Sequence, residues 1–217
     1  MANKLPRQID RVKRMLLDLG GEVEASVHEA VQALESMDPI RAQKVVERDA
    51  AIDLMEVDLE EECLKLLALY QPVATDLRFI VAVLKINNDL ERIGDMAANI
   101  ARRAKETCEN GAVELPFDIA TMTGKVQSML KRGLDALVNQ DEELARRVLA
   151  DDDAVDREYY AIHDRILGAI RRHPDQLENY IRMMLAARHL ERIADHATNI
   201  AEDVIYLVQG EIVRHRD

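Results

Sequence analysis

The chain has 217 residues, of which 48% are apolar and 32% are charged, a composition typical of folded proteins with long amphipathic helices. This balance excludes a disordered chain. The 41 acidic residues outnumber the 29 basic ones and give a net charge of −12, which repels the phosphates of DNA and RNA, so we expect no nucleic-acid partner.

The beginning of the chain has no apolar signal core, because residues 1–7 lead into a charged amphipathic segment. No run of about 18 apolar residues occurs, so the sequence predicts a cytoplasmic protein that reaches a membrane only peripherally, through its partners. Cys63 and Cys108 lie far apart, without the spacing of a metal site. We expect them to be reduced, packed thiols.

Prolines and glycines divide the chain into segments with helical periodicity, and no segment has the pattern of a strand. Asp38 before Pro39 is typical of a helix N-cap, Pro72 and Pro174 interrupt longer patterns, and Gly210 indicates a helix stop. These signals predict an all-α protein with six long helices over residues 4–37, 39–70, 74–108, 117–138, 141–172 and 175–209.

The most loop-like part of the chain is the segment 109–116, which contains a glycine and a proline between two helical patterns. We place a boundary there. The sequence therefore predicts one three-helix unit over residues 1–110 and a second one over residues 111–217.

The two halves repeat each other. Residues 90–101 recur as residues 190–201 with nine of twelve positions identical. Earlier in each half the offset is 103 and pairs, for example, Asp38 with Asp141. Two copies are too few for an extended solenoid, so we expect a tandem repeat of two three-helix bundles built from antiparallel helices.

Each half carries two pairs of acids at i,i+4 spacing, which places both carboxylates of a pair on one helix face. In the third helix, Glu91 and Asp95 lie more than 90° from the apolar stripe, so we expect them outside the core. The four pairs are Asp49 and Asp53, Glu91 and Asp95, Asp152 and Asp156, and Glu191 and Asp195.

The acidic pairs belong to longer rows of oxygen ligands. Asn99 continues the row of the third helix, and Asn199 and Asp203 continue that of the sixth. If neighbouring helices run antiparallel, rows from two helices converge. The rows on the second and fifth helices also include Glu56, Glu60, Tyr159 and His163.

Like charges at i,i+4 destabilise a helix by about 0.2–0.5 kcal/mol per pair, so converging rows need a neutralising partner. Hard cations such as Mg²⁺, Mn²⁺, Ca²⁺ and iron prefer carboxylate oxygens over the soft ligands that favour zinc or copper. Two other interpretations stay open. The rows are a solvated surface, or they are balanced by Arg92, Arg188 or Arg192 without metal.

Motifs for catalysis are missing from the sequence, which has no phosphate-binding glycine loop, nucleophile elbow or His-Glu-x-x-His motif. We therefore do not expect an enzyme. The Glu-x-x-His repeat of di-iron carboxylate proteins is also absent, which argues against a metal-storage or redox protein. A helical adaptor that needs no metal is the remaining alternative.

The segments 90–95, 190–196 and 71–78 resemble the PhoU family, and the resemblance spans both halves. It implies two three-helix bundles with E/D-x-x-x-D motifs on two helices of each repeat. Thr75, Asp76 and Arg78 also match a family signature, which the second half replaces with Asp-Gln-Leu-Glu.

The same resemblance implies a cytoplasmic, homodimeric negative regulator of phosphate uptake and of the phosphate-starvation response. Its implied partners are the ATPase subunit of the phosphate-specific ABC transporter and a phosphate-responsive histidine kinase. Metal ions (Fe, Mn, Mg or Zn) would bind the eight acids of the four motifs, with Asn99 and Asn199 as flanking oxygen donors.

Overall fold

The computed structural model describes residues 4–111 and 117–210, and within these ranges it contains helices and no strand. Six α-helices and one 3-10 turn follow one another along the chain. They are α1 (Leu5–Ser36), α2 (Pro39–Tyr70), α3 (Ala74–Glu109), α4 (Ala120–Asn139), α5 (Glu142–Arg172), η1 (Pro174–Gln176) and α6 (Leu177–Gln209).

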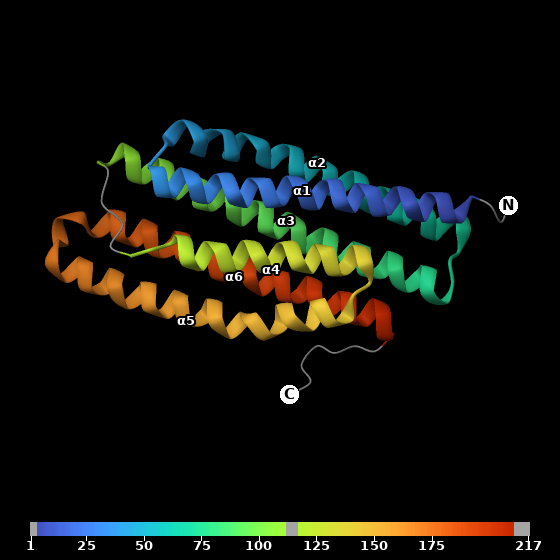
Figure 1. Ribbon diagram of the computed structural model, residues 1–217. Coiled ribbons are helices and arrows are strands. Elements are labelled where there is room, and N and C mark those ends of the chain that lie inside the picture. The colour runs from blue at the N-terminus through green and yellow to red at the C-terminus, as the bar shows by residue number, and fades with distance from the viewer. Residues whose placement is uncertain (1–3, 112–116, 211–217) are drawn as a thin grey trace.

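The helices form two bundles side by side (Figure 1). Helices α1, α2 and α3 pack on one another, as do α4, α5 and α6. The bundles meet mainly along α3 and α6, which share the most extensive contact of any helix pair, and α1 touches α4 on the face turned to the viewer. The predicted fold, two three-helix bundles in tandem, is confirmed.

The helix ends follow the local sequence. Asp38 accepts hydrogen bonds from the backbone N–H groups of Ile40 and Arg41, both at 3.0 Å, and its counterpart Asp141 caps α5 through Leu144 N at 2.9 Å. Gly210 ends α6 with a φ of 75°, as predicted.

One boundary was predicted too early. The fourth helix begins at Ala120 rather than at residue 117, because Asp118 accepts hydrogen bonds from Ala120 N and Thr121 Oγ1 and turns the chain there. The predicted boundary between halves falls at Asn110, the C-cap of α3, and residues 112–116 lie outside the described residues.

The duplication is most exact on the inner faces of α2 and α5. Each helix buries six residues, and every one of the six in α2 has its counterpart 103 positions later in α5. The pairs are Ala42 and Ala145, Val45 and Val148, Ile52 and Val155, Leu59 and Ile162, Cys63 and Ile166, and Leu66 and Ala169.

Both cysteines are free thiols, as predicted. Cys63 is buried in the core of the first bundle, and that burial raises the pKa of its thiol to about 12. Across residues 4–111 and 117–210, none of the helices has the length and apolar character needed to cross a membrane.

Candidate metal centres

The first acidic cluster consists of Asp49 and Asp53 on α2 with Glu91 and Asp95 on α3. The packing of these two helices brings their acidic rows together. Partial burial, then the charges of Asp95 and Asp53, raise the pKa of Asp49. Partial burial and Asp95 likewise raise the pKa of Glu91, and Asp53 on the other helix adds to the effect. The carboxylates therefore lie close enough to repel one another.

The second acidic cluster is the equivalent set in the other bundle, with Asp152 and Asp156 on α5 and Glu191 and Asp195 on α6. Partial burial, followed by the charges of Asp156 and Asp195, raises the pKa of Asp152 to about 6. Burial and the neighbouring Asp195 raise the pKa of Glu191, which is only 8% exposed. Partial burial also raises the pKa of Asp195.

Arginines contact acids of both clusters. Arg102 lies at 3.3 Å from Asp49 Oδ2 and also donates to Asn99 Oδ1 at 2.8 Å. In the second cluster Arg188 donates to Glu191 and lies over the Tyr159 ring, 5.6 Å from its centroid. The arginines therefore neutralise opposite ends of the two clusters.

Sequence analysis proposed Arg188 as a balancing cation but missed Arg102. The signal was present, because Arg102 lies two helical turns after Asp95 and therefore on the same face of α3. Arg92, another proposed balancing residue, is exposed and lies 3.4 Å from Glu91 Oε2. The interpretation in which arginines balance the acids is thus partly supported.

We predicted that Asn199 and Asp203 extend the acidic row of the sixth helix, but in the structure they do not join the second cluster. Asp203 is buried against α3, where Lys85 Nζ lies 3.0 Å from its Oδ1. Asn199 Nδ2 donates to Asp89 Oδ1 at 3.3 Å. These residues turn toward the junction between the bundles because the row winds around α6 as it lengthens.

His196 and His163, the two histidines nearest to the acidic rows in the sequence, contact acids outside the clusters. His196 Nδ1 lies 2.7 Å from Asp89 Oδ1 at the junction between α3 and α6. His163 Nδ1 lies 3.7 Å from Asp164 Oδ1 on its own helix. The candidate metal ligands are therefore carboxylate oxygens.

The donor chemistry of both clusters fits a hard cation. Glu191 Oε2 is buried, and no hydrogen-bond partner for it is found among the described residues. Such an oxygen is destabilising unless a cation or donor reaches it. In the described ranges no group of three or more His, Cys, Asp or Glu side chains is arranged as a ready metal site. Binding a cation therefore requires carboxylates to rotate toward it.

Gly94 lets α2 and α3 approach closely between Glu91 and Asp95. A Cβ atom on Gly94 would lie 3.1 Å from Ile52 Cγ2. The second bundle has Ala194 where the first has Gly94, and Val155 where the first has Ile52. The residue on α6 is thus larger than its counterpart on α3, and the residue on α5 is smaller than its counterpart on α2. The two bundles thus fill the same space beside the acids in different ways.

The family signature in the segment 71–78 lies at the start of α3. Arg78 NH2 lies 3.4 Å from Thr75 Oγ1, and a Cβ atom on Gly210 would lie 3.7 Å from the Arg78 guanidinium. The signature is thus placed next to the end of α6, so it joins the two bundles. The second half has an equivalent contact beside the replaced segment, because Asn179 Nδ2 donates to Gly111 O, after the end of α3, at 3.0 Å.

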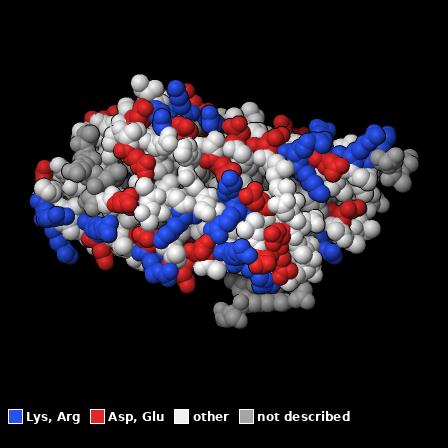
Figure 2. Space-filling model, viewed as in Figure 1, with Lys and Arg blue, Asp and Glu red and all other residues white. Residues whose placement is uncertain are grey.

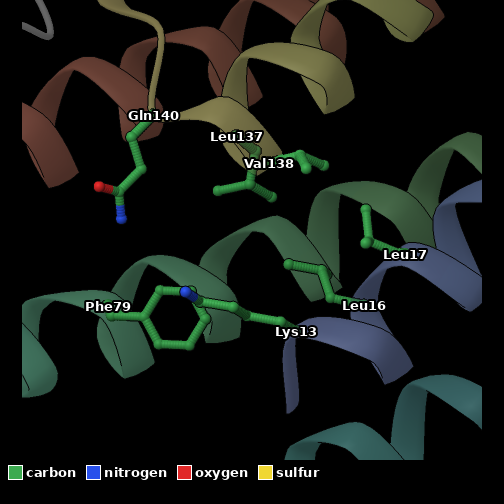
Figure 3. A pocket seen from close by; sticks show the side chains of 7 residues that line it. All are labelled: Lys13, Leu16, Leu17, Phe79, Leu137, Val138 and Gln140. Carbon is green, nitrogen blue, oxygen red and sulfur yellow. The ribbon is translucent and has the colours of Figure 1, made fainter. Parts of the chain in front are cut away.

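A separate small cavity of about 50 Å³ lies between α1, the start of α3 and the end of α4. Figure 3 shows Phe79 and Lys13 on one side and Leu137 and Gln140 on the other. Lys13 Nζ lies 5.3 Å from the centroid of the Phe79 ring. The lining is mostly apolar and has no paired acid and base, so its chemistry differs from that of the clusters.

The face shown in Figure 2 carries Lys and Arg side chains interspersed with Asp and Glu. That distribution agrees with the net charge of −12 and does not form the concentrated basic surface that nucleic-acid binding requires.

Two equivalent three-helix bundles, each with a carboxylate cluster between its second and third helices, define a class of duplicated helical proteins. The model of the PhoU domain matches this chain twice, over residues 16–104 and 119–204. The chain belongs to the PhoU family.

Named relatives align with nearly the whole chain. The phosphate-specific transport system accessory protein PhoU homolog of Pseudomonas aeruginosa is 42% identical over 96% of this chain and 86% of that protein. The homolog from Aquifex aeolicus is 37% identical over 98% of this chain and 96% of its own length. The accessory protein PhoU of Escherichia coli is 31% identical, over 96% of this chain and 86% of that protein.

Solved structures agree with these relatives. The crystal structure of PhoU from Pseudomonas aeruginosa superposes with a TM-score of 0.90 at 42% identity, covering 95% of this chain and 99% of that chain. The phosphate transport system regulatory protein PhoU from Streptococcus pneumoniae gives 0.87 at 32% identity, covering 96% and 99%. The chain is thus an accessory and regulatory protein of phosphate-specific transport.

Proposed function

We propose that this protein is a cytoplasmic negative regulator of phosphate uptake whose two acidic clusters bind metal ions. The observation that carries the proposal is the repetition of four carboxylates at equivalent places in both bundles, where several of their pKa values are raised. A bound cation would hold the carboxylates of α2 and α3, and of α5 and α6, in their charged forms and join each helix pair.

The regulatory role follows from the family. It couples the ATPase subunit of the phosphate-specific ABC transporter to a phosphate-responsive histidine kinase and represses the starvation response, with the protein acting as a homodimer. Iron, manganese and magnesium fit the oxygen donors best, and zinc is a further candidate. The protein reaches the membrane through these partners.

Deletion and replacement of the gene in the organism that encodes it test the regulatory role. We expect deletion to switch on a phosphate-starvation reporter in phosphate-rich medium, and the wild-type gene to restore repression. Replacement with a Glu91→Gln/Asp95→Asn/Glu191→Gln/Asp195→Asn variant should leave the reporter on. Exposed acids outside the clusters, as in Asp18→Asn, provide the control.

Unchanged reporter activity after deletion would reject the regulatory role. Full repression by the neutralised variant, expressed at the wild-type level, would instead reject the role of the clusters. The metal-independent adaptor would then be the better account, and Arg102 and Arg188 favour it because they already neutralise part of each cluster.

A further inference from the structure

The outer face of α2 carries an unpartnered apolar surface, which we call the α2 stripe. Leu54 is 68% exposed, Leu64 is 51% exposed and Val57 is 47% exposed. The spacing of these residues puts them on one helix face, and small exposed residues extend the row over about 27 Å at 1.5 Å per residue. The stripe comprises Ala50, Leu54, Val57, Leu64 and Ala68, with the exposed Glu61 between Val57 and Leu64 on the same face.

The fold does not need apolar residues at every one of these positions. In α5, whose inner face matches that of α2 residue for residue, the outer face holds Asp153, Arg157 and Arg171 where α2 has Ala50, Leu54 and Ala68, while Tyr160 and Leu167 stand in the places of Val57 and Leu64. Exposed apolar rows with helical spacing are a known way to anchor a partner helix. The repeats therefore differ at Ala50, Leu54 and Ala68, where charges in α5 break the row, and the continuous apolar row belongs to the first bundle.

The charges beside the stripe define the kind of partner. Glu47 and Asp58 are exposed on one flank, and Asp53 and Glu60 are exposed on the other. The nearby cation Lys65 is engaged with Glu61, with Nζ 3.0 Å from Oε2. Two copies of the stripe facing each other would bring these acidic flanks together, so a second copy of this chain is disfavoured.

We propose that the α2 stripe is a docking site for an amphipathic helix of a partner protein whose apolar row is flanked by Lys or Arg. Leu54, Val57 and Leu64 bury the apolar row of that helix, and the acidic flanks pair with its cations. This inference goes beyond the proposed regulatory role and does not depend on metal binding.

A designed 18-residue helical peptide with a leucine row flanked by lysines is the probe, and fluorescence anisotropy in chelator measures its binding to the full chain. We expect the charge-neutral variant Leu54→Gln/Val57→Thr/Leu64→Gln to bind it at least ten-fold more weakly than wild type. The control Ile40→Gln/Ile181→Gln/Leu185→Gln changes three exposed apolar residues away from the stripe and should bind like wild type.

Two further peptides separate the contributions. Replacing the lysines by glutamates, or the leucines by serines, should each weaken binding to wild type at least ten-fold. A photoreactive group on the leucine face of the first peptide should crosslink to α2. Circular dichroism confirms that each variant is folded.

Equal binding of the first peptide to wild type and to the stripe variant would overturn the proposal. So would equal binding of the serine peptide, which carries charge alone. Sedimentation equilibrium tests whether a second copy of this chain binds the stripe instead. If wild type forms a dimer that the stripe variant does not, the stripe binds a second copy and the proposal is wrong.

Discussion

The two acidic clusters have carboxylates at equivalent positions but differ in which of these acids an arginine contacts. In the first cluster Arg102 contacts Asp49 and the exposed Arg92 contacts Glu91, whereas in the second Arg188 contacts Glu191, the counterpart of Glu91. The position equivalent to Arg102 holds Glu202. Duplication has therefore kept the acids and moved the counter-charge, which is expected if the acids have a function and the arginines only moderate their repulsion.

The largest difference between the clusters should follow removal of the arginines. Arg188 opposes the repulsion at both Glu191 and Asp195, whereas the first cluster keeps Arg92 beside Glu91 when Arg102 is removed. We expect the free energy of unfolding in chelator to fall by about 2 kcal/mol for Arg188→Met and by about 1 kcal/mol for Arg102→Met, measured by urea denaturation. Equal losses, or a gain, would contradict this account of the two clusters.

A smaller effect is expected from Asp152. Its pKa is about 6 in the folded protein against an ordinary 3.8, so the folded state holds the proton more tightly. The stability that this proton provides is therefore lost as the pH rises through 6. Asp152→Asn removes this loss and should stabilise the metal-free protein by about 1 kcal/mol at pH 7, after allowing for solvent screening, and by little at pH 4.

The exposed neighbour Asp153 is the control for this measurement, because Asp153→Asn removes the same charge from the same helix. Its effect at pH 7 should be clearly smaller. Asp49→Asn should also stabilise less than Asp152→Asn, since Arg102 already opposes the repulsion at Asp49. A gain for Asp152→Asn that is as large at pH 4 as at pH 7 would contradict the raised pKa.

The smallest effect concerns packing beside the acids. Gly94→Ala improves the helix propensity of α3 but pushes the new Cβ toward Ile52. Combining it with Ile52→Val reproduces the pair that the second bundle uses, so the two substitutions should be coupled favourably by about 0.5 kcal/mol in a double-mutant cycle. Strict additivity of the two free-energy changes in urea denaturation would mean that residues 52 and 94 do not interact, which would contradict this account of the packing.

Much of the fold could be predicted from local signals. Asp38 and Gly210 marked helix ends because capping depends on a few adjacent residues, and the repeated segment around Glu91 and Glu191 revealed the duplication. The start of α4 was misplaced because Asp118 competes as a cap with the helical pattern before it.

The site was less accessible to sequence analysis. Spacing grouped the acids on helix faces, yet it could not show which residues of facing helices meet. Arg102 belongs to the same face as Asp95, but only the packing of α2 against α3 brings it to Asp49. Asp203 was assigned to the acidic row, and the pairing with Lys85 across the bundles removed it.

Metal analysis by mass spectrometry tests the central claim, that both acidic clusters bind cations, most directly. Untagged protein is purified without added metal or chelator and compared with Glu91→Gln/Asp95→Asn, with Glu191→Gln/Asp195→Asn and with an Asp18→Asn/Glu35→Gln control, which changes exposed acids outside the clusters. We predict metal in the wild type and the control, a partial loss in each cluster variant and complete loss when the two are combined. Wild-type protein without metal that also shows no thermal shift with iron, manganese, magnesium or zinc would contradict the claim.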